Sequence, residues 1–271
     1  MSDAELVNAD MQSFWNGVGG TTWVKRQAHT DITLQPVADA LLAHASPEVG
    51  ESVLDVGCGC GASTIDFARA VGPNGSVSAM DISRPMLAEA RARARVAGVT
   101  NVEWRLADAA TARLGSYDLL TSMFGLMFFG NPAAAFTHLR RAANGGGRMC
   151  FVTWRSLAEN PWMGVPMEAV TPHLPPRTMG KPNAPGMFAF ADPAHLKEVL
   201  TSAGWSPPAF KALDCDLDIA ANRGIDEAVT QSTEIGAVNS WLRNQPDEIV
   251  SMSIESIRKA LTPYVDGESV R

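Results

Sequence analysis

The stretch Val53-Leu-Asp-Val-Gly-Cys-Gly-Cys-Gly-Ala62 decides the fold, because it joins an apolar run to a turn with three glycines. Residues 52–56 have the length and composition of a buried strand, and Ser63 follows as a helix cap that faces Asp66. Glycine lets a ligand approach the backbone closely, and a helix N-terminus offers N–H groups to an anion. The turn matches both G-x-G-x-x-A and G-x-G-x-G, so either match alone leaves the class of ligand open.

Segments that predict strands alternate with segments that predict helices between residues 51 and 154. Strands are expected at residues 52–56, 76–80, 101–106, 117–123 and 148–154. Helices are expected to begin near residues 63, 85 and 132, between these strands. Strands that are separated by helices pair in parallel through right-handed crossovers. We therefore predict an α/β fold with a doubly wound, mostly parallel sheet and helices on both faces.

The rest of the chain adds to this core, and we expect one domain over residues 1–271. Residues 1–48 predict a helical cover, and residues 50–155 contain the core. Residues 156–190 are expected to form a lid that needs no regular hydrogen bonding, because they are rich in proline and in apolar side chains (Trp162, Met163, Phe188 and Phe190). Residues 191–271 predict a helix at 192–203, a half-exposed strand at 210–219 and C-terminal helices at 225–243 and 246–261. The tail at 262–271 stops without a further strand for the sheet.

Acidic residues stand where three of the predicted strands end. Asp55 precedes the first glycine of the turn by two residues, and a like charge about 5 Å away would oppose a pyrophosphate by roughly 3 kcal/mol. An amino-acid group suits this place better, because its ammonium is attracted to Asp55 and its carboxylate to the helix N-terminus. Asp81 can accept from ribose hydroxyls, and Asp108 from an adenine amine, with Met86 and Leu106 or Ala109 beside the ring. The pattern indicates an adenosine joined to an amino acid, which is S-adenosyl-L-methionine (SAM).

These motifs resemble those of the class I SAM-dependent methyltransferases, which have a Rossmann-like fold. Val53-Leu-Asp-Val-Gly-Cys-Gly-Cys-Gly61 is similar to their first motif, and Met80-Asp-Ile-Ser83 with Met86-Leu87 to their second. Residues 117–132, the glycines at 145–147 and Trp154 resemble the ubiquinone/menaquinone-biosynthesis-like (methyltransferase type 11) small-molecule branch.

The resemblance implies a SAM-binding core at residues 50–155. By this likeness the glycine turn and Asp55 hold the methionine end, Asp81 the ribose and Asp108 the adenine, and residues 122–124 line the methionine and acceptor side. The residues expected to bind the cofactor are Trp23, Asp55, Gly57, Cys58, Gly59, Gly61, Asp81, Ile82, Met86, Asp108, Ala109, Ser122 and Met123.

The expected reaction is methyl transfer to a small-molecule acceptor by in-line displacement. Alignment can contribute on the order of 7–11 kcal/mol without a covalent intermediate, so no catalytic residue is assigned. The apolar lid favours an apolar or aromatic acceptor, while the methylated atom (O, N, C or S) and the oligomeric state stay open. Two alternatives also stay open: an NAD(P)-dependent oxidoreductase, which Asp55 opposes, and a SAM-binding protein without activity.

Composition excludes several other classes of function. The net charge of −7 argues against nucleic-acid partners, which require clustered Lys and Arg. Cys58, Cys60, Cys150 and Cys215 have no metal-site spacing, so we expect no metal. The uncharged stretch at 119–139 is interrupted by Gly130-Asn-Pro132, so we expect no membrane span. The N-terminus has no signal-peptide pattern, which predicts a cytoplasmic protein.

Overall fold

The computed structural model describes residues 3–176, 181 and 183–271, with only the backbone described for residues 3–7. The chain divides into two compact units. The first contains Met1–Val24, Val37–Trp154 and Pro182–Ala212, and the second contains Lys25–Pro36, Arg155–Lys181 and Leu213–Arg271. The expectation of one domain over residues 1–271 stays a prediction.

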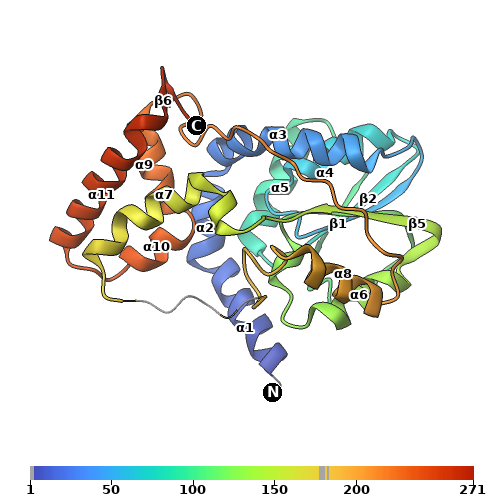
Figure 1. The fold of residues 1–271 in the computed structure, drawn as a ribbon. Helices are drawn as coiled ribbons and strands as arrows, with labels where there is room; N and C mark the ends of the chain where they lie inside the picture. Colours follow the sequence, from blue (N-terminus) through green and yellow to red (C-terminus); the bar gives the residue numbers. More distant parts are fainter. Residues whose placement is uncertain (1–2, 177–180, 182) are drawn as a thin grey trace. The chain divides into compact units, whose positions relative to one another are not determined.

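A five-stranded parallel sheet forms the centre of the first unit (Figure 1). Its strand order is β3-β2-β1-β4-β5, and every neighbouring pair is parallel. The strands are β1 (Ser52–Val56), β2 (Ser76–Asp81), β3 (Val102–Leu106), β4 (Tyr117–Met123) and β5 (Ala143–Val152). The predicted doubly wound α/β sheet is thus confirmed, since both outer strands are reached from the central β1. The strand β5 begins earlier than residue 148, because Ala143 already pairs with Tyr117 of β4, before a register shift.

Helices cover both faces of this sheet. On one face, the C-terminal part of α3 (Gln27–Ala45) and α4 (Ala62–Val71) pack Leu41, Phe67 and Val71 against Val53 and Leu119. The helix α5 (Arg84–Val96) lies on the same face and packs Leu87 against Ala79 of β2. The helices α6 (Pro132–Arg141) and α8 (Pro193–Ser202) lie on the other face. The first unit also contains α1 (Asp3–Asn16), most of α2 (Val18–Lys25) and the one-turn helix η1 (Leu126–Phe128).

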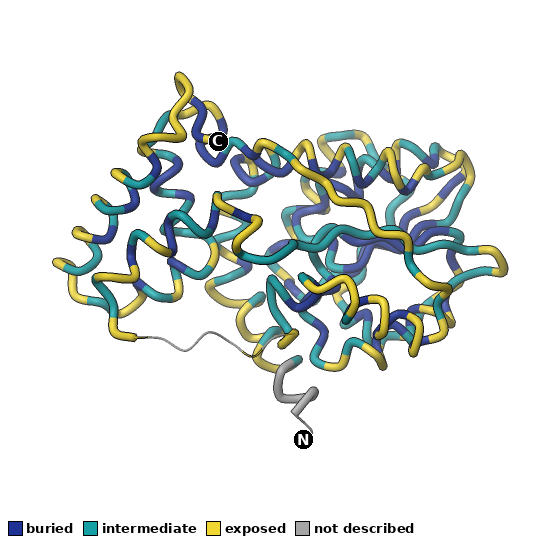
Figure 2. The backbone as a smooth tube through the Cα atoms, viewed as in Figure 1, coloured by how far each residue is buried: buried dark blue, intermediate teal, exposed yellow. Residues whose placement is uncertain are grey.

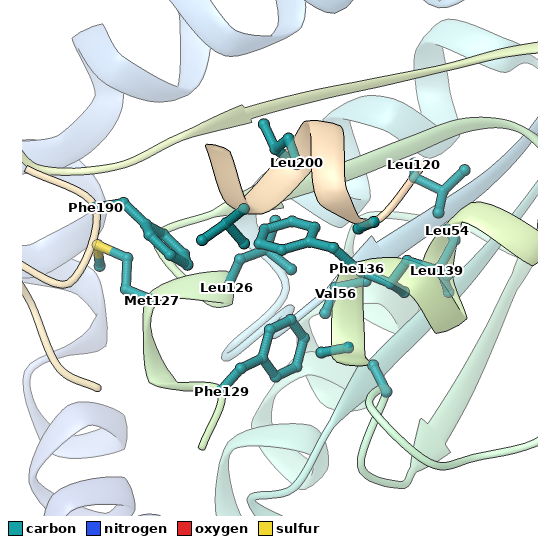
Figure 3. Packing of buried hydrophobic residues seen from close by; sticks show 14 of the residues in the cluster. Leu54, Val56, Leu120, Leu126, Met127, Phe129, Phe136, Leu139, Phe190 and Leu200 are labelled. Carbon is teal, nitrogen blue, oxygen red and sulfur yellow. The ribbon is translucent and has the colours of Figure 1, made fainter. Parts of the chain in front are cut away.

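The largest part of the core lies between the sheet and the helices α6 and α8. Figure 3 shows Phe136 of α6 among Leu126, Leu139 and Leu200, and all four side chains are almost completely buried. Burying a side chain of this size contributes about 1.5–3 kcal/mol. Figure 2 shows that buried positions follow the inner strands of the sheet, β1, β2 and β4, which is the pattern of parallel strands covered on both faces.

The second unit consists mainly of helices. It contains α7 (Pro161–Val170), α9 (Ile225–Glu234), α10 (Ala237–Leu242) and α11 (Asp247–Leu261), with short helices at Thr171–His173 and Thr262–Tyr264. A two-strand antiparallel hairpin of β6 (Val265–Asp266) and β7 (Ser269–Val270) ends the chain, separately from the five-stranded sheet. The N-terminal part of α3 belongs to this unit, where His29 lies 3.0 Å from the carbonyl oxygen of Ile219.

Several predicted elements differ from the observed ones. The prediction of a strand at 210–219 is wrong, because this segment is irregular. Its alternating acidic and apolar residues suit an exposed segment, but this alternation does not supply the neighbouring strand that a sheet requires. The helix expected at 225–243 is broken at Gly236, whose φ of +84° is incompatible with a continuous helix.

The prediction that Ser63 caps the helix after the glycine turn is also wrong. The N-cap of α4 is Gly61, without a side-chain hydrogen bond, and the Ser63 hydroxyl binds Asp55 instead.

The segment expected to be a lid lies in both units. Its first part forms the regular helix α7, so the expectation of a cover without regular hydrogen bonding is wrong there. Its last residue, Phe190, is 3% exposed and packs 5.8 Å from Phe136 in the core of the first unit. Residues 177–180 and 182 of the expected lid lie outside the described residues. The lid itself stays a prediction.

No helix in the described part of the chain is long and apolar enough to cross a membrane.

Candidate functional site

The glycine turn between β1 and α4 has a backbone that only glycine adopts readily. The φ angles of Gly57, Gly59 and Gly61 are +70°, +55° and +82°. The N–H groups of Gly57 and Cys58 both donate to the carbonyl oxygen of Met80, at 2.8 and 3.0 Å. These bonds hold the turn against the carboxyl end of β2. A side chain at Gly57 is further excluded because its Cβ would lie 2.7 Å from the Cα of Gly125.

Asp55 lies beneath the turn and is completely buried. The hydroxyls of Thr64 and Ser63 donate to its Oδ2, at 2.6 and 3.3 Å, and its Oδ1 has no hydrogen-bond partner among the described residues. Burial raises the pKa of Asp55 to about 6 against these two hydrogen bonds. The sequence predicts an open carboxylate beside a ligand at Asp55, whereas in the structure this side chain is directed toward the first turn of α4.

Asp81 is the last residue of β2 and connects the turn to the next helix. Its Oδ2 accepts from the N–H of Gly59 and its Oδ1 from the N–H of Ser83, both at 2.8 Å. Burial raises its pKa. A carboxylate offers about four lone-pair sites, so Asp81 can still accept from a further donor beyond these backbone groups.

Asp108 stands two residues beyond the end of β3. Its Oδ1 accepts from the N–H of Ala110 at 2.8 Å, and its Oδ2 accepts from Nδ2 of Asn8 at 3.2 Å. The Oδ1 of Asn8 accepts in turn from the N–H of Gly130 at 3.1 Å. Asn8 therefore links the loops after β3 and β4. Asn8 is not predictable from the sequence, since an asparagine within a predicted helix has no pattern of its own.

The helices α1 and α2 attach to the loop after β2. Ser83 donates to the carbonyl oxygen of Trp15 at 2.6 Å, and Nδ2 of Asn16 donates to the carbonyl oxygen of Ile82 at 2.8 Å. Trp23 is half-buried and makes an edge contact with Trp15 at 6.0 Å, and Trp15 makes another with Phe128 at 5.6 Å. Ile82, in the loop after β2, and Trp23, in α2, thus lie on segments that are connected through α1 within the first unit.

Ser122 and Met123, at the end of β4, have different surroundings. Ser122 is fully buried; its hydroxyl donates to the carbonyl oxygen of Val56 at 2.7 Å and accepts from the N–H of Gly125 at 3.0 Å. Met123 packs against the core layer of α3 and α4. Ser122 therefore connects β1 to the loop after β4 through two hydrogen bonds.

The other expected residues lie around the turn. Met86 is buried, and its terminal methyl would lie 3.1 Å from a Cβ on Gly59. Cys58 packs between Ala79 and Leu87, and burial raises the pKa of its thiol. Ala109 is buried in the core layer of α6 and α8.

The geometry brings three carboxylates to one edge of the sheet. Asp108 follows β3, and Asp81 and Asp55 belong to β2 and β1; these strands are neighbours in that order, and the carboxyl ends of parallel strands meet at the same edge. The residues fit a nucleoside joined to an amino acid on two observations: the left-handed glycine turn keeps Cβ atoms away, and a buried carboxylate oxygen of Asp55 lacks a partner. Among the described residues no cluster of His, Cys, Asp or Glu is arranged to hold a metal ion.

This sheet order, with a glycine turn after β1 and an acid at the end of β2, defines a Rossmann-like fold of the class I methyltransferase type. Residues 53–147 match the family model described as a methyltransferase domain. These residues therefore contain a SAM-dependent methyltransferase domain.

Two relatives support this assignment, and one solved structure supports the fold. The chain is 29% identical over 243 residues to nocamycin O-methyltransferase from Saccharothrix syringae, covering 86% of this chain and 85% of that protein. It is 34% identical over 120 residues to the ubiquinone/menaquinone biosynthesis C-methyltransferase UbiE from Burkholderia vietnamiensis, covering 44% of this chain and 49% of that protein. The fold is similar to that of the YcgJ protein from Bacillus subtilis, with a TM-score of 0.52, 15% identity and coverage of 79% and 86%. These comparisons offer no support for the NAD(P)-dependent or non-catalytic alternatives.

Proposed function

We propose that this SAM-dependent methyltransferase acts on a small, apolar or aromatic molecule, and that the residues at the carboxyl ends of β1, β2 and β3 hold the cofactor. A small-molecule acceptor is supported by the match to nocamycin O-methyltransferase over most of both chains. The same relative favours an oxygen atom as the site of methylation.

Each carboxylate would bind a different part of SAM. Asp81 would accept from the ribose hydroxyls, since its carboxylate has acceptor capacity left beyond its backbone bonds. Asp108, held by Asn8, would accept from the adenine amine. Asp55 would act from beneath the turn: with a pKa of about 6 it is ionised at neutral pH, and its charge favours an ammonium at the methionine end.

When bound, SAM supplies an electrophilic methyl group on a sulfonium. The contribution of this chain is to orient the acceptor in line with that methyl and to exclude water. Such positioning can lower the barrier by on the order of 7–11 kcal/mol, and it requires no covalent intermediate. The observation that carries the assignment is the position of Asp108, Asp81 and Asp55 at or just beyond the carboxyl ends of three neighbouring strands.

Calorimetry with SAM, S-adenosylhomocysteine and NADH tests the cofactor site. We expect the two adenosyl compounds to bind and NADH not to bind, with Asp81→Asn and Asp108→Asn each weakening S-adenosylhomocysteine at least tenfold. Asp118→Asn is the matched control: this carboxylate lies near the amino end of β4, bound to Ser52 and Asn144, so its loss should leave affinity unchanged. Wild-type affinity in both site variants would contradict the assignment.

Transfer of labelled methyl from SAM to a panel of phenols, enols, carboxylic acids and amines tests the reaction. We expect label in small hydroxylated acceptors, and the site variants that lose affinity should lose turnover. Tight binding of SAM without transfer to any member of a broad panel would instead support the non-catalytic alternative.

A further inference from the structure

Two aromatic side chains are stacked at the carboxyl ends of β4 and β5. The rings of Phe124 and Trp154 are 4.1 Å apart between centroids and inclined by only 4°. Phe124 directly follows β4, and Trp154 stands two residues beyond the end of β5. The backbone N–H of Phe124 donates to the carbonyl oxygen of Val152 at 3.2 Å, so the two strand ends remain paired up to this point.

This stacked pair lies next to the glycine turn. Phe124 is followed by Gly125, whose own Cβ would lie 2.6 Å from the carbonyl oxygen of Val56 and 2.9 Å from the Cα of Gly57. The backbone of the first glycine in the turn is therefore in direct contact with the residue after Phe124. Gly57 is at the end of the site proposed for the methionine part of SAM, which carries the methyl group. The stacked pair thus stands beside the place where methyl transfer would occur.

Phe124 keeps this position in an unfavourable backbone conformation. Its φ is +66°, in the left-handed region that bulky residues rarely adopt. Such conformations persist where the surrounding structure enforces them, and they concentrate at functional sites. Both rings are only half-buried, although they pack against the core layer of α6 and α8. The stack therefore keeps part of its aromatic surface open.

We propose that the open surface of the Phe124–Trp154 stack receives the methyl acceptor and selects planar, conjugated molecules. Aromatic rings attract other flat π-systems through offset or edge contacts, beyond the effect of buried area alone. Phe124 is the specificity-determining residue, and Trp154 is a positioning residue that holds the Phe124 ring in its orientation. This inference rests on the proposed function and specifies its acceptor class.

Binding of a matched pair of probes to the full chain tests the proposal. The probes are 2-naphthol and its saturated analogue decahydro-2-naphthol, which share a ten-carbon skeleton and a hydroxyl but differ in planarity. Affinities are measured by NMR titration of protein saturated with S-adenosylhomocysteine, so the readout does not depend on turnover. For the wild type we expect 2-naphthol to bind at least tenfold more tightly than decahydro-2-naphthol.

Substitutions then locate the preference. Phe124→Leu and Trp154→Leu should reduce the preference to threefold or less, while Phe124→Tyr and Trp154→Phe, which keep a ring, should retain it. Phe210→Leu is the control, because Phe210 is 49% exposed in an irregular segment of the same unit and its loss should change nothing. Calorimetry with S-adenosylhomocysteine verifies that each variant is folded and keeps its cofactor affinity within threefold.

The outcomes separate this inference from the proposed function. Equal binding of the two probes to the wild type, or an unchanged preference in Phe124→Leu, overturns the inference while S-adenosylhomocysteine still binds. Loss of S-adenosylhomocysteine affinity in both leucine variants would show that the stack supports the glycine turn rather than the acceptor, which also overturns it. Failure of the wild type to bind S-adenosylhomocysteine would overturn the proposed function itself and this inference with it.

Discussion

Gly57 and Gly125 are in backbone contact: a Cβ built on Gly57 would lie 2.7 Å from the Cα of Gly125. The contact joins the turn after β1 to the loop after β4, which are separated in sequence by the whole β2–β3 crossover. It leaves no space for a side chain on either residue. The turn proposed to bind the cofactor therefore depends on Gly125, which lies 68 positions after Gly57 in the sequence.

Gly57→Ala should damage both stability and cofactor binding. The new methyl group meets backbone rather than a movable side chain, and the φ of +70° adds strain, so we expect a loss of at least about 2 kcal/mol in the free energy of unfolding. Gly98→Ala is the matched control, since Gly98 has a φ of +69° and open space around its Cβ position. It should cost about 1 kcal/mol and leave S-adenosylhomocysteine affinity unchanged. Urea unfolding and calorimetry check both; equal losses for the two variants would show that the contact is unimportant.

Asp55→Asn should change how stability depends on pH. Burial raises the folded pKa of Asp55 to about 6 from 3.8, so between pH 4 and pH 6 the folded state holds a proton that the unfolded state has lost. The free energy of unfolding therefore decreases as pH rises through that window. The decrease reaches about 3 kcal/mol for a pKa difference of about two units. The ligand-free asparagine variant should lack this decrease, and at pH 7 it should be at least as stable as the wild type but bind S-adenosylhomocysteine more weakly. Parallel pH profiles of the unfolding free energy would show that Asp55 is not the source.

Asp118→Asn should have the opposite pH signature. Hydrogen bonds from the Ser52 hydroxyl and N–H and from Asn144 lower the pKa of Asp118 to about 2. Its contribution is present above pH 4 and disappears as pH falls from about 4 to about 2. We expect the variant to lose about 1 kcal/mol at pH 7, a value typical of a hydrogen bond, and to converge with the wild type near pH 2. Thermal or urea unfolding between pH 2 and pH 7 measures this; a gap that stays constant with pH would contradict it.

Ser122→Ala and Thr121→Val should differ in their effect on the free energy of unfolding, although both remove a buried hydroxyl from β4. Ser122 bonds the carbonyl oxygen of Val56 and the N–H of Gly125, so its loss leaves two buried groups unpaired and should cost about 1–3 kcal/mol. The Thr121 hydroxyl has no partner among the described residues, so valine should be neutral or stabilising. Chemical unfolding of both variants checks this, and a Thr121→Val loss as large as that of Ser122→Ala would contradict it.

The parts of the fold that were predictable have local causes. The strands from β1 to β4 were located within one or two residues, because short apolar runs between turn residues identify buried strands. The segment at 210–219 shows the limit of this reasoning, because a strand also needs a partner edge and the alternation of side chains does not reveal one. Gly236 likewise ended a predicted helix, since its positive φ depends on how α9 and α10 pack.

The sequence by itself determined the parallel sheet and the placing of Asp81 and Asp108 at one edge, because strand ends meet there whenever helices separate the strands. Only the tertiary structure decided how those side chains are used. In the folded chain Asp55 is buried and accepts a hydrogen bond from Thr64, and Asn8 donates to Asp108, 100 residues away. Phe124, whose backbone is left-handed, stacks on Trp154. The physical reason is the range of the forces: hydrophobic periodicity and turn chemistry act over a few neighbouring residues, whereas a hydrogen-bond partner or a stacked ring is selected by the packing of the folded chain.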